Sequence, residues 1–212
     1  MFTEKMVAAF RAAAMMHQKQ KRKGSETPYI AHPMAVASLV LEHGGGEDVF
    51  CAALLHDTIE DCKMDPGLIA SIFGQPVLDM VEAVTNPPID WKSFKSNEEL
   101  QHTLKAFRII MFEKIREADP QVQLLSACDK LHNARGLLVD LRRARDGVGE
   151  GKKPEEVAQL VVAVWDRFRG KRQGTLWYYV ELAKVYSESE SAQVRNLGRE
   201  LREVCDGMDA DF

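Results

Sequence analysis

Apolar residues recur every three or four positions along most of the chain, and this spacing is typical of amphipathic helices. A first helix is predicted over residues 3 to about 20, and a second runs from Pro33 to the glycines at 44–46, which end it. A central helix is predicted from Glu47 to Asp61, followed by short helices over 66–73 and 76–84. No segment alternates with period two for long enough to require a sheet, so the sequence predicts an all-α protein.

The second half of the chain also reads as helices. A loop over 86–95 precedes Ser96, which with Glu99 forms a capping box for a helix ending near residue 118. The next helix is expected from Asp119-Pro120 to about residue 145. A Gly- and Lys-rich stretch over 146–154 is the best boundary, dividing a core (1–148) from a C-terminal helical extension (149–212) that is expected to pack on it. Helices are predicted there over 154–168, 173–187 and 191–206.

The central helix carries unusual chemistry. An apolar run from Val49 to Leu55 is followed by four ionisable residues within six positions, namely His56, Asp57, Glu60 and Asp61. Buried charges are costly unless they are compensated, and a divalent cation is a simple compensation for imidazole and carboxylate groups. For the His-Asp pair at the end of the apolar run we favour a metal site. For the two later acids alone, exposure to solvent is the simpler interpretation.

A hydrolytic metal site usually needs further protein ligands. His32 precedes Pro33 at a helix start, and Asp129 interrupts an otherwise apolar helical segment, so both are candidates. Taken singly, each has a structural explanation, because His32 could cap a helix and Asp129 could pair with a nearby Arg or Lys. The pattern as a whole is more specific than either residue.

That pattern, His…His-Asp…Asp at 32, 56–57 and 129, resembles the HD superfamily of metal-dependent phosphohydrolases. The resemblance covers roughly residues 1–145. It is closer to the hydrolase half of RelA/SpoT proteins and to small single-domain alarmone hydrolases. The residues that carry it are Arg22-Lys23, Pro28 to Pro33, Ala52 to Asp61, and Asp129 to Arg135.

The resemblance implies an all-α HD-domain helical bundle and one divalent ion, usually Mn²⁺, although other transition metals are possible. The implied metal ligands are His32, His56, Asp57 and Asp129. By the same match Glu60 and Asp61 are the catalytic acids, and the residues that contact substrate are Arg22, Lys23 and Asn133. Tyr29 matches a position near the substrate, but packing is its simpler interpretation.

The implied activity is hydrolysis of a nucleotide, in its sharpest form removal of diphosphate from the 3′ position of (p)ppGpp. Gly136, where the family typically has a polar residue, keeps open a general HD nucleotidase or phosphodiesterase. A nucleotide-binding HD module without turnover is a third possibility. We interpret the other histidines as surface or local structural residues, namely His17, His43, His102 and His132.

Composition and charge narrow the classes of molecule that the protein is expected to bind. The chain of 212 residues is 45% hydrophobic and 28% charged, as in globular proteins, and its net charge of −4 argues against bulk affinity for nucleic acid. No apolar run reaches membrane-spanning length, and the charged N-terminal segment reads as a helix and not a signal peptide. Four scattered cysteines indicate reduced thiols in a cytoplasm. The expected partner is a small anionic nucleotide, and the sequence gives no signal for an oligomeric state.

Overall fold

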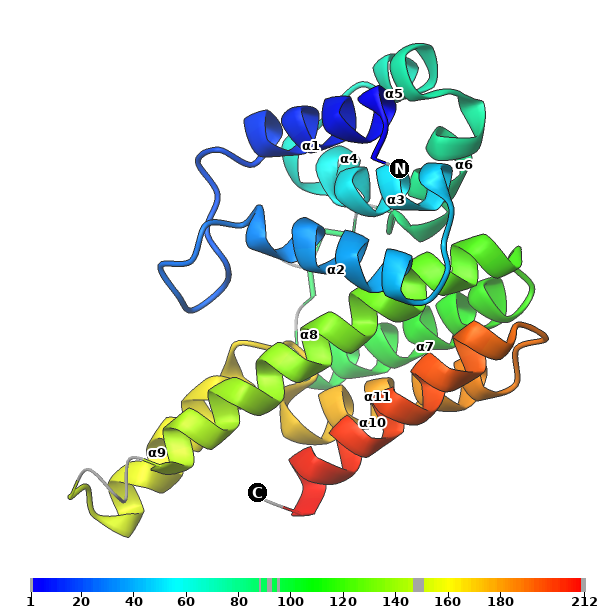
Figure 1. Ribbon diagram of the computed structural model, residues 1–212. Coiled ribbons are helices and arrows are strands. Elements are labelled where there is room, and N and C mark those ends of the chain that lie inside the picture. The colour runs from blue at the N-terminus through cyan, green and yellow to red at the C-terminus, as the bar shows by residue number, and fades with distance from the viewer. Residues whose placement is uncertain (1, 88, 91–92, 95, 147–150, 211–212) are drawn as a thin grey trace.

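Helices make up the fold throughout the described part of the chain, which is residues 2–87, 89–90, 93–94, 96–146 and 151–210 of a computed structural model (Figure 1). Within those residues there is no strand, only an isolated antiparallel bridge between Lys21 and Pro28. The all-α prediction is therefore confirmed. The helices are α1 (Glu4–Met16), α2 (Ala31–Glu42), α3 (Glu47–Leu55), α4 (Thr58–Cys62), α5 (Pro66–Phe73), α6 (Gln75–Val84), α7 (Asn97–Arg116), α8 (Pro120–Asp146), α9 (Pro154–Asp166), α10 (Lys171–Ser187) and α11 (Ala192–Ala210).

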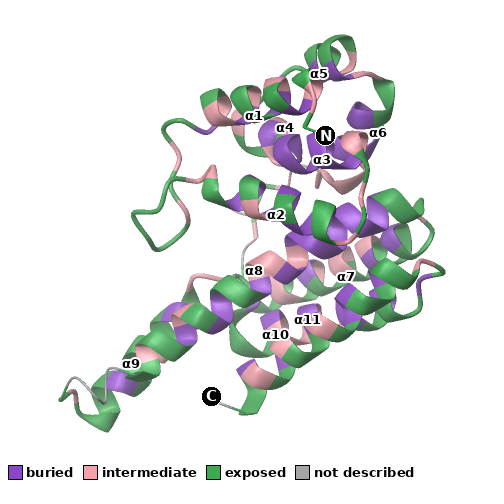
Figure 2. Ribbon diagram, in the orientation of Figure 1, coloured by how far each residue is buried: buried purple, intermediate pink, exposed green. Residues whose placement is uncertain are grey.

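The apolar run of the sequence becomes the most buried helix of the N-terminal half. Every residue of α3 from Val49 to Leu55 is buried, and α1, α2, α6 and α8 pack around it (Figure 2). A helix that is apolar on all sides needs neighbours on all sides, which explains this central position. The residues that follow α3 therefore begin inside the protein.

Helix α8 connects the two halves of the fold. Its 27 residues span about 40 Å at 1.5 Å per residue. It packs on α2, α3 and α6 and also on α9, α10 and α11 (Figure 1). Side chains near the middle of α8, among them Asp129, therefore lie between the N-terminal helices and α10.

Several predicted boundaries differ from the observed ones. Helix α1 ends at Met16 and not near residue 20, and α2 begins at Ala31, two residues before Pro33. Proline fits within this first turn because the first backbone N–H groups of a helix have no partner inside it. The predicted boundary between 148 and 149 lies outside the described residues, so that division of the chain stays a prediction.

Two further expectations can be compared with the structure. All four cysteines are free thiols. Among the described residues, no helix combines the length and the apolar character needed to cross a membrane.

Candidate metal centre and active site

The central helix predicted from Glu47 to Asp61 is broken. Helix α3 ends at Leu55, His56 and Asp57 form a turn, and α4 begins at Thr58. Asp57 occupies the N-cap position of α4, yet its side chain makes no capping hydrogen bond there. An Asp at this position usually stabilises its helix by about 1 kcal/mol. The carboxylate is turned away from that role and toward His56 and His32.

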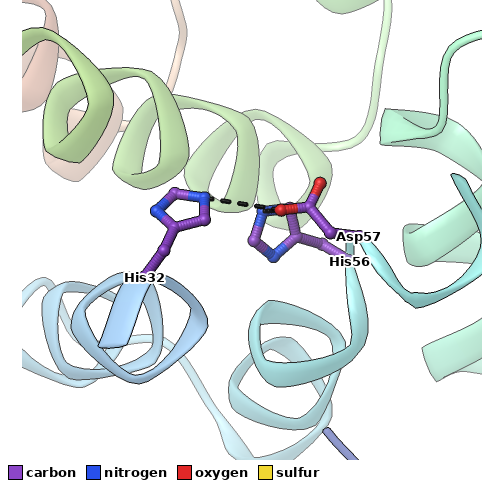
Figure 3. Close-up of side chains that lie close together, drawn as sticks. All are labelled: His32, His56 and Asp57. Carbon is purple, nitrogen blue, oxygen red and sulfur yellow. Dashed lines mark ion pairs between the residues drawn. The ribbon is translucent and has the colours of Figure 1, made fainter. Parts of the chain in front are cut away.

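Four side chains from three parts of the chain meet at this turn. His32 on α2, His56 and Asp57 each offer one ligand atom, and these atoms all lie within 4.8 Å of one another (Figure 3). Asp129 on α8 completes the group, because its Oδ1 lies 3.1 Å from His32 Nε2 and 3.7 Å from His56 Nε2. Asp57 Oδ2 lies 3.0 Å from His56 Nε2 and 3.5 Å from His32 Nε2. The structure thus brings together all four predicted ligands.

The donor set fits a metal ion. His56 donates from Nδ1 to the Ala53 carbonyl, 2.7 Å away, which leaves Nε2 as the ring nitrogen available to a metal ion. That buried Nε2 has no hydrogen-bond partner, although two carboxylates lie nearby. Ligand atoms about 2.1 Å from one metal ion lie roughly 3 to 4 Å apart, and the four nitrogen–oxygen separations given above, from 3.0 to 3.7 Å, fall in that range. A divalent cation would compensate both carboxylates and use the unpartnered nitrogen.

Burial and charge act against each other in this cluster. Burial alone would raise the pKa of Asp129 and lower that of Lys130, but their mutual attraction shifts both pKa values in the opposite direction. Burial also opposes the low pKa of Asp57, which His56 maintains. Both carboxylates are therefore held ionised, the form that binds metal.

His132 has a role that its sequence position did not reveal. The interpretation of this residue as surface or local structure is wrong, because its Nδ1 lies 2.8 Å from Nδ1 of His32 across one hundred positions of sequence. Burial, followed by the nearby His32 and Arg22, lowers the pKa of His132 to about 4, so its ring is neutral and its unprotonated nitrogen can accept a hydrogen bond. Coordination through His32 Nε2 places the proton of that ring on Nδ1, and His32 Nδ1–H then donates a hydrogen bond to Nδ1 of His132.

Tyr29 also contacts the cluster. Its hydroxyl donates to Asp57 Oδ2 at 2.7 Å, and its ring packs against those of His17 and His32. Burial and the Asp57 charge raise the pKa of Tyr29, so the phenol stays a donor. Packing is therefore only part of what this residue does.

The three predicted substrate residues lie together beside the cluster. Asn133, one turn after Asp129 on α8, donates to Asp129 Oδ1 at 2.6 Å and accepts from Arg22 Nη2 at 2.9 Å. Lys23 donates to the carbonyl of Arg167 and lies 5.7 Å from the Phe168 ring centre. The loop between α1 and α2, which carries Arg22 and Lys23, thus contacts α8 and the segment after α9.

These residues line a cavity of about 670 Å³, which we call the Arg22 cavity. It is also lined by His32, His132, Arg135 and Gly136. Its size suits a nucleotide-sized ligand, for which cavities of 300 to 1,000 Å³ are common. Cationic groups line it, including Arg22, Lys23, Arg135, Arg143 and Arg167.

The two predicted catalytic acids occupy different surroundings. Glu60 accepts from the backbone and side-chain nitrogens of Asn86, both at 3.2 Å, and lines a second cavity of about 660 Å³, the Lys130 cavity. Asp61 accepts from Gln20 Nε2 at 2.7 Å. Because Lys130 pairs with Asp129, and Asp129 contacts His32 of the first cavity, the cluster lies between the two cavities.

Comparison with known proteins agrees with this architecture. The HD domain family matches residues 9–176, more than half of the chain. The chain belongs to the HD-domain family. The match includes all the site residues described above and continues into α10.

Two curated relatives illustrate the resemblance of this HD domain. The guanosine-3′,5′-bis(diphosphate) 3′-pyrophosphohydrolase MESH1 of Xenopus tropicalis is 33% identical over 161 residues, covering 74% of this chain and 81% of the relative. A probable guanosine-3′,5′-bis(diphosphate) 3′-pyrophosphohydrolase of Synechocystis is 36% identical over 129 residues. That match covers 61% of this chain but only 16% of the cyanobacterial protein. This HD domain therefore spans a small part of that relative and most of the other.

Solved structures share the fold. A metazoan SpoT orthologue, described as hydrolysing ppGpp, matches with a TM-score of 0.64 and 23% identity, covering 95% of this chain and 94% of that one. A Listeria monocytogenes protein matches with a TM-score of 0.54 and 21% identity over 82% of this chain and 99% of that one. The helical arrangement of this HD domain is thus a known one.

Proposed function

We propose that the protein is a metal-dependent phosphohydrolase that removes diphosphate from the 3′ position of guanosine 3′,5′-bis(diphosphate). The observation that carries this proposal is the convergence of His32, His56, Asp57 and Asp129 beside a cationic cavity. The activity for which the two relatives are named supports this choice of substrate. The four free thiols support a location in a reducing cytoplasm.

The four clustered side chains would hold one divalent ion, for which we propose Mn²⁺. Imidazole and carboxylate ligands suit this ion and its first-row neighbours. When bound, such an ion polarises a phosphoryl oxygen and makes water more acidic. Tyr29 and His132 orient the ligands Asp57 and His32 through the hydrogen bonds described above.

Glu60 and Asp61 are proposed as the acid and base. Water attacks the phosphorus bonded to the ribose 3′ oxygen, and the P–O3′ bond breaks. The side chain that is ionised takes a proton from the attacking water, and the other, as a carboxylic acid, supplies a proton to the ribose oxygen. The products are guanosine 5′-diphosphate and free diphosphate.

The two cavities suggest how the substrate is oriented. Arg22, Lys23 and Asn133 would bind the nucleotide in the Arg22 cavity, because guanidinium and ammonium groups offset phosphate charge. The Lys130 cavity is lined by Glu60 and by the cationic Lys63 and Arg108, and it would receive the diphosphate. Arg108 is held in place by its hydrogen bond to the Gly174 carbonyl at 2.6 Å.

A second activity is favoured by one observation. Gly136 lines the Arg22 cavity, and a side chain added there would meet no atom within 4 Å. The nucleotide cavity therefore has open space where a polar side chain could read the base. This favours hydrolysis of other nucleotides by the same site, so a range of substrates must be compared.

The test is incubation of the Mn²⁺-loaded protein with guanosine 3′,5′-bis(diphosphate), followed by chromatography for guanosine 5′-diphosphate and diphosphate. Adenine and pyrimidine nucleotides in parallel report base preference. Glu60→Gln and Asp61→Asn should each lower kcat by roughly 10²- to 10⁴-fold, while Glu82→Gln, at an exposed position of α6, should not. Metal-loaded protein without turnover of any nucleotide would leave a binding module as the remaining interpretation.

A further inference from the structure

A chain of three polar side chains connects the interior of the protein to Asp61. His17, at the C-terminal end of α1, lies with Nδ1 2.7 Å from Oε1 of Gln20. The amide nitrogen of Gln20 donates to Oδ2 of Asp61 on α4 at 2.7 Å. The three residues come from two segments that are more than 40 positions apart in sequence. None of them was expected to contact another.

The chemistry of the acceptor fixes the direction of every hydrogen bond in this chain. An ionised carboxylate only accepts hydrogen bonds, so Asp61 requires the NH₂ end of the Gln20 amide. The amide oxygen of Gln20 then faces His17, whose Nδ1 must carry the proton and donate. Only the His17 tautomer with its proton on Nδ1 is therefore compatible with the hydrogen bond from Gln20 to Asp61.

His17, at the buried end of this series of hydrogen bonds, is enclosed by its neighbours. His17 is only 2% exposed, and its ring lies against Tyr29 with the centroids 4.8 Å apart. The Cys62 thiol lies 3.3 Å from His17 Nδ1 and encloses the same ring. Gln20 is held by its backbone as well, because its N–H donates to the His17 carbonyl and its own carbonyl accepts from the Tyr29 N–H, both at 2.9 Å. Gln20 therefore has little freedom to move away from Asp61.

Asp61 itself has little else to hold it. It is exposed and lies on α4, a helix of only five residues. In the part of the chain that the structure describes, Gln20 is the one side chain that donates a hydrogen bond to it. An exposed carboxylate samples several rotamers unless a partner selects one, and this freedom is costly for a group that must transfer a proton.

We propose that His17 and Gln20 are positioning residues that hold the Asp61 carboxylate in its reactive orientation. This inference rests on the proposed function, in which Asp61 transfers a proton. Neither residue needs to touch the substrate. Loss of either should therefore lower kcat more than it changes KM or metal binding.

The first test compares Gln20→Ala with Gln18→Ala, a matched substitution at an exposed position two residues away. Gln20→Ala should lower kcat roughly 10- to 100-fold, while KM and bound Mn²⁺ stay within about twofold. Gln18→Ala should match the wild type. A Gln20→Ala enzyme with wild-type kcat would overturn the proposal, and so would a loss that only follows reduced metal content.

The second test separates positioning from packing at His17. His17→Asn retains an N–H donor near the place of Nδ1, whereas His17→Leu fills the site without one. We expect His17→Asn to keep more activity than His17→Leu. In the Gln20→Ala background His17→Leu should cause little further loss of kcat, because both act through one hydrogen bond. If the two substitutions instead multiply their separate losses of kcat, the hydrogen-bonded connection through Gln20 is refuted.

A third measurement separates failure of this inference from failure of the proposed function. The side-chain amide protons of Gln20 are observed by ¹H–¹⁵N NMR, with Gln18 as the internal reference. Asp61→Ala and His17→Leu should each shift the Gln20 amide toward the position of the exposed Gln18 amide. Unchanged Gln20 signals would refute the chain even for a protein that leaves guanosine 3′,5′-bis(diphosphate) intact. Shifted signals without turnover would support the contact and refute only the proposed substrate.

Discussion

Replacing Tyr29 by Phe tests how far the metal centre depends on groups that do not bind the metal. The substitution removes the hydroxyl that donates to Asp57 Oδ2 at 2.7 Å. It keeps the ring, which lies 4.8 Å from the His17 ring and 5.7 Å from the His32 ring between centroids. The packing around the cluster should therefore survive while one hydrogen bond is lost.

The size of the effect follows from the charge on the acceptor. A hydrogen bond to an ionised group contributes about 1.5–3 kcal/mol. Each 1.4 kcal/mol corresponds to about a tenfold change in an equilibrium constant. If this hydrogen bond holds Asp57 in its binding orientation, Tyr29→Phe should weaken Mn²⁺ binding roughly 10- to 100-fold, the usual range for partners of metal ligands.

Competition with a chelator of known affinity measures the Mn²⁺ dissociation constant. Tyr186→Phe is the matched control. The Tyr186 hydroxyl shares a buried hydrogen bond with Ser126 at 2.8 Å, and among the described residues it forms no hydrogen bond with any of the four proposed ligands. The control substitution should reduce the free energy of unfolding by about 1 kcal/mol and leave Mn²⁺ affinity unchanged. Equal Mn²⁺ affinity in Tyr29→Phe and the wild type would refute the reasoning.

Three further predictions concern the substrate cavity, the core and the thiols. In steady-state assays Arg22→Met should raise KM about tenfold with a smaller change in kcat. The control Arg11→Met, at an exposed position of α1, should change neither constant. An unchanged KM in Arg22→Met would show that Arg22 does not bind the substrate. Leu125→Ala, at a fully buried position, should lower the free energy of unfolding by about 2–5 kcal/mol in urea titrations, and a loss under 1 kcal/mol would contradict the packing. Burial raises the pKa of Cys51 to about 11, so about 0.1% is thiolate at pH 8. Mass spectrometry after alkylation should find label at half-exposed Cys62 before Cys51, and the reverse order would contradict the fold.

The sequence predicted the fold class from local patterns, and it predicted the cluster of four side chains from motifs spread along the chain that resemble a known family. The apolar run before His56 requires burial, and the helical period leaves no place for a sheet. The cost of burying His56 and Asp57 indicated a metal site at that pair, and the resemblance to the HD superfamily implied His32 and Asp129 as further ligands. The structure brings His32 and Asp129 to the same point as His56 and Asp57.

Local sequence patterns could not predict the contacts that support the four clustered side chains. His132 and His32 are one hundred positions apart, and their contact depends on how α2 packs on α8. The break between α3 and α4 was also missed, because no Gly or Pro marks it. An Asp at that turn, preceded by His, was the available signal, since Asp is frequent at helix N-caps.

The claim on which the rest depends is that side chains from α2, from the turn after α3, and from α8 hold one divalent cation. Equilibrium dialysis against Mn²⁺, with metal content measured per chain, tests it most directly. We predict about one Mn²⁺ per chain for the wild type and less than about a tenth of that for His56→Ala and Asp129→Ala, each of which removes a ligand. A wild-type protein that retains no metal, or variants that retain a full equivalent, would contradict the account.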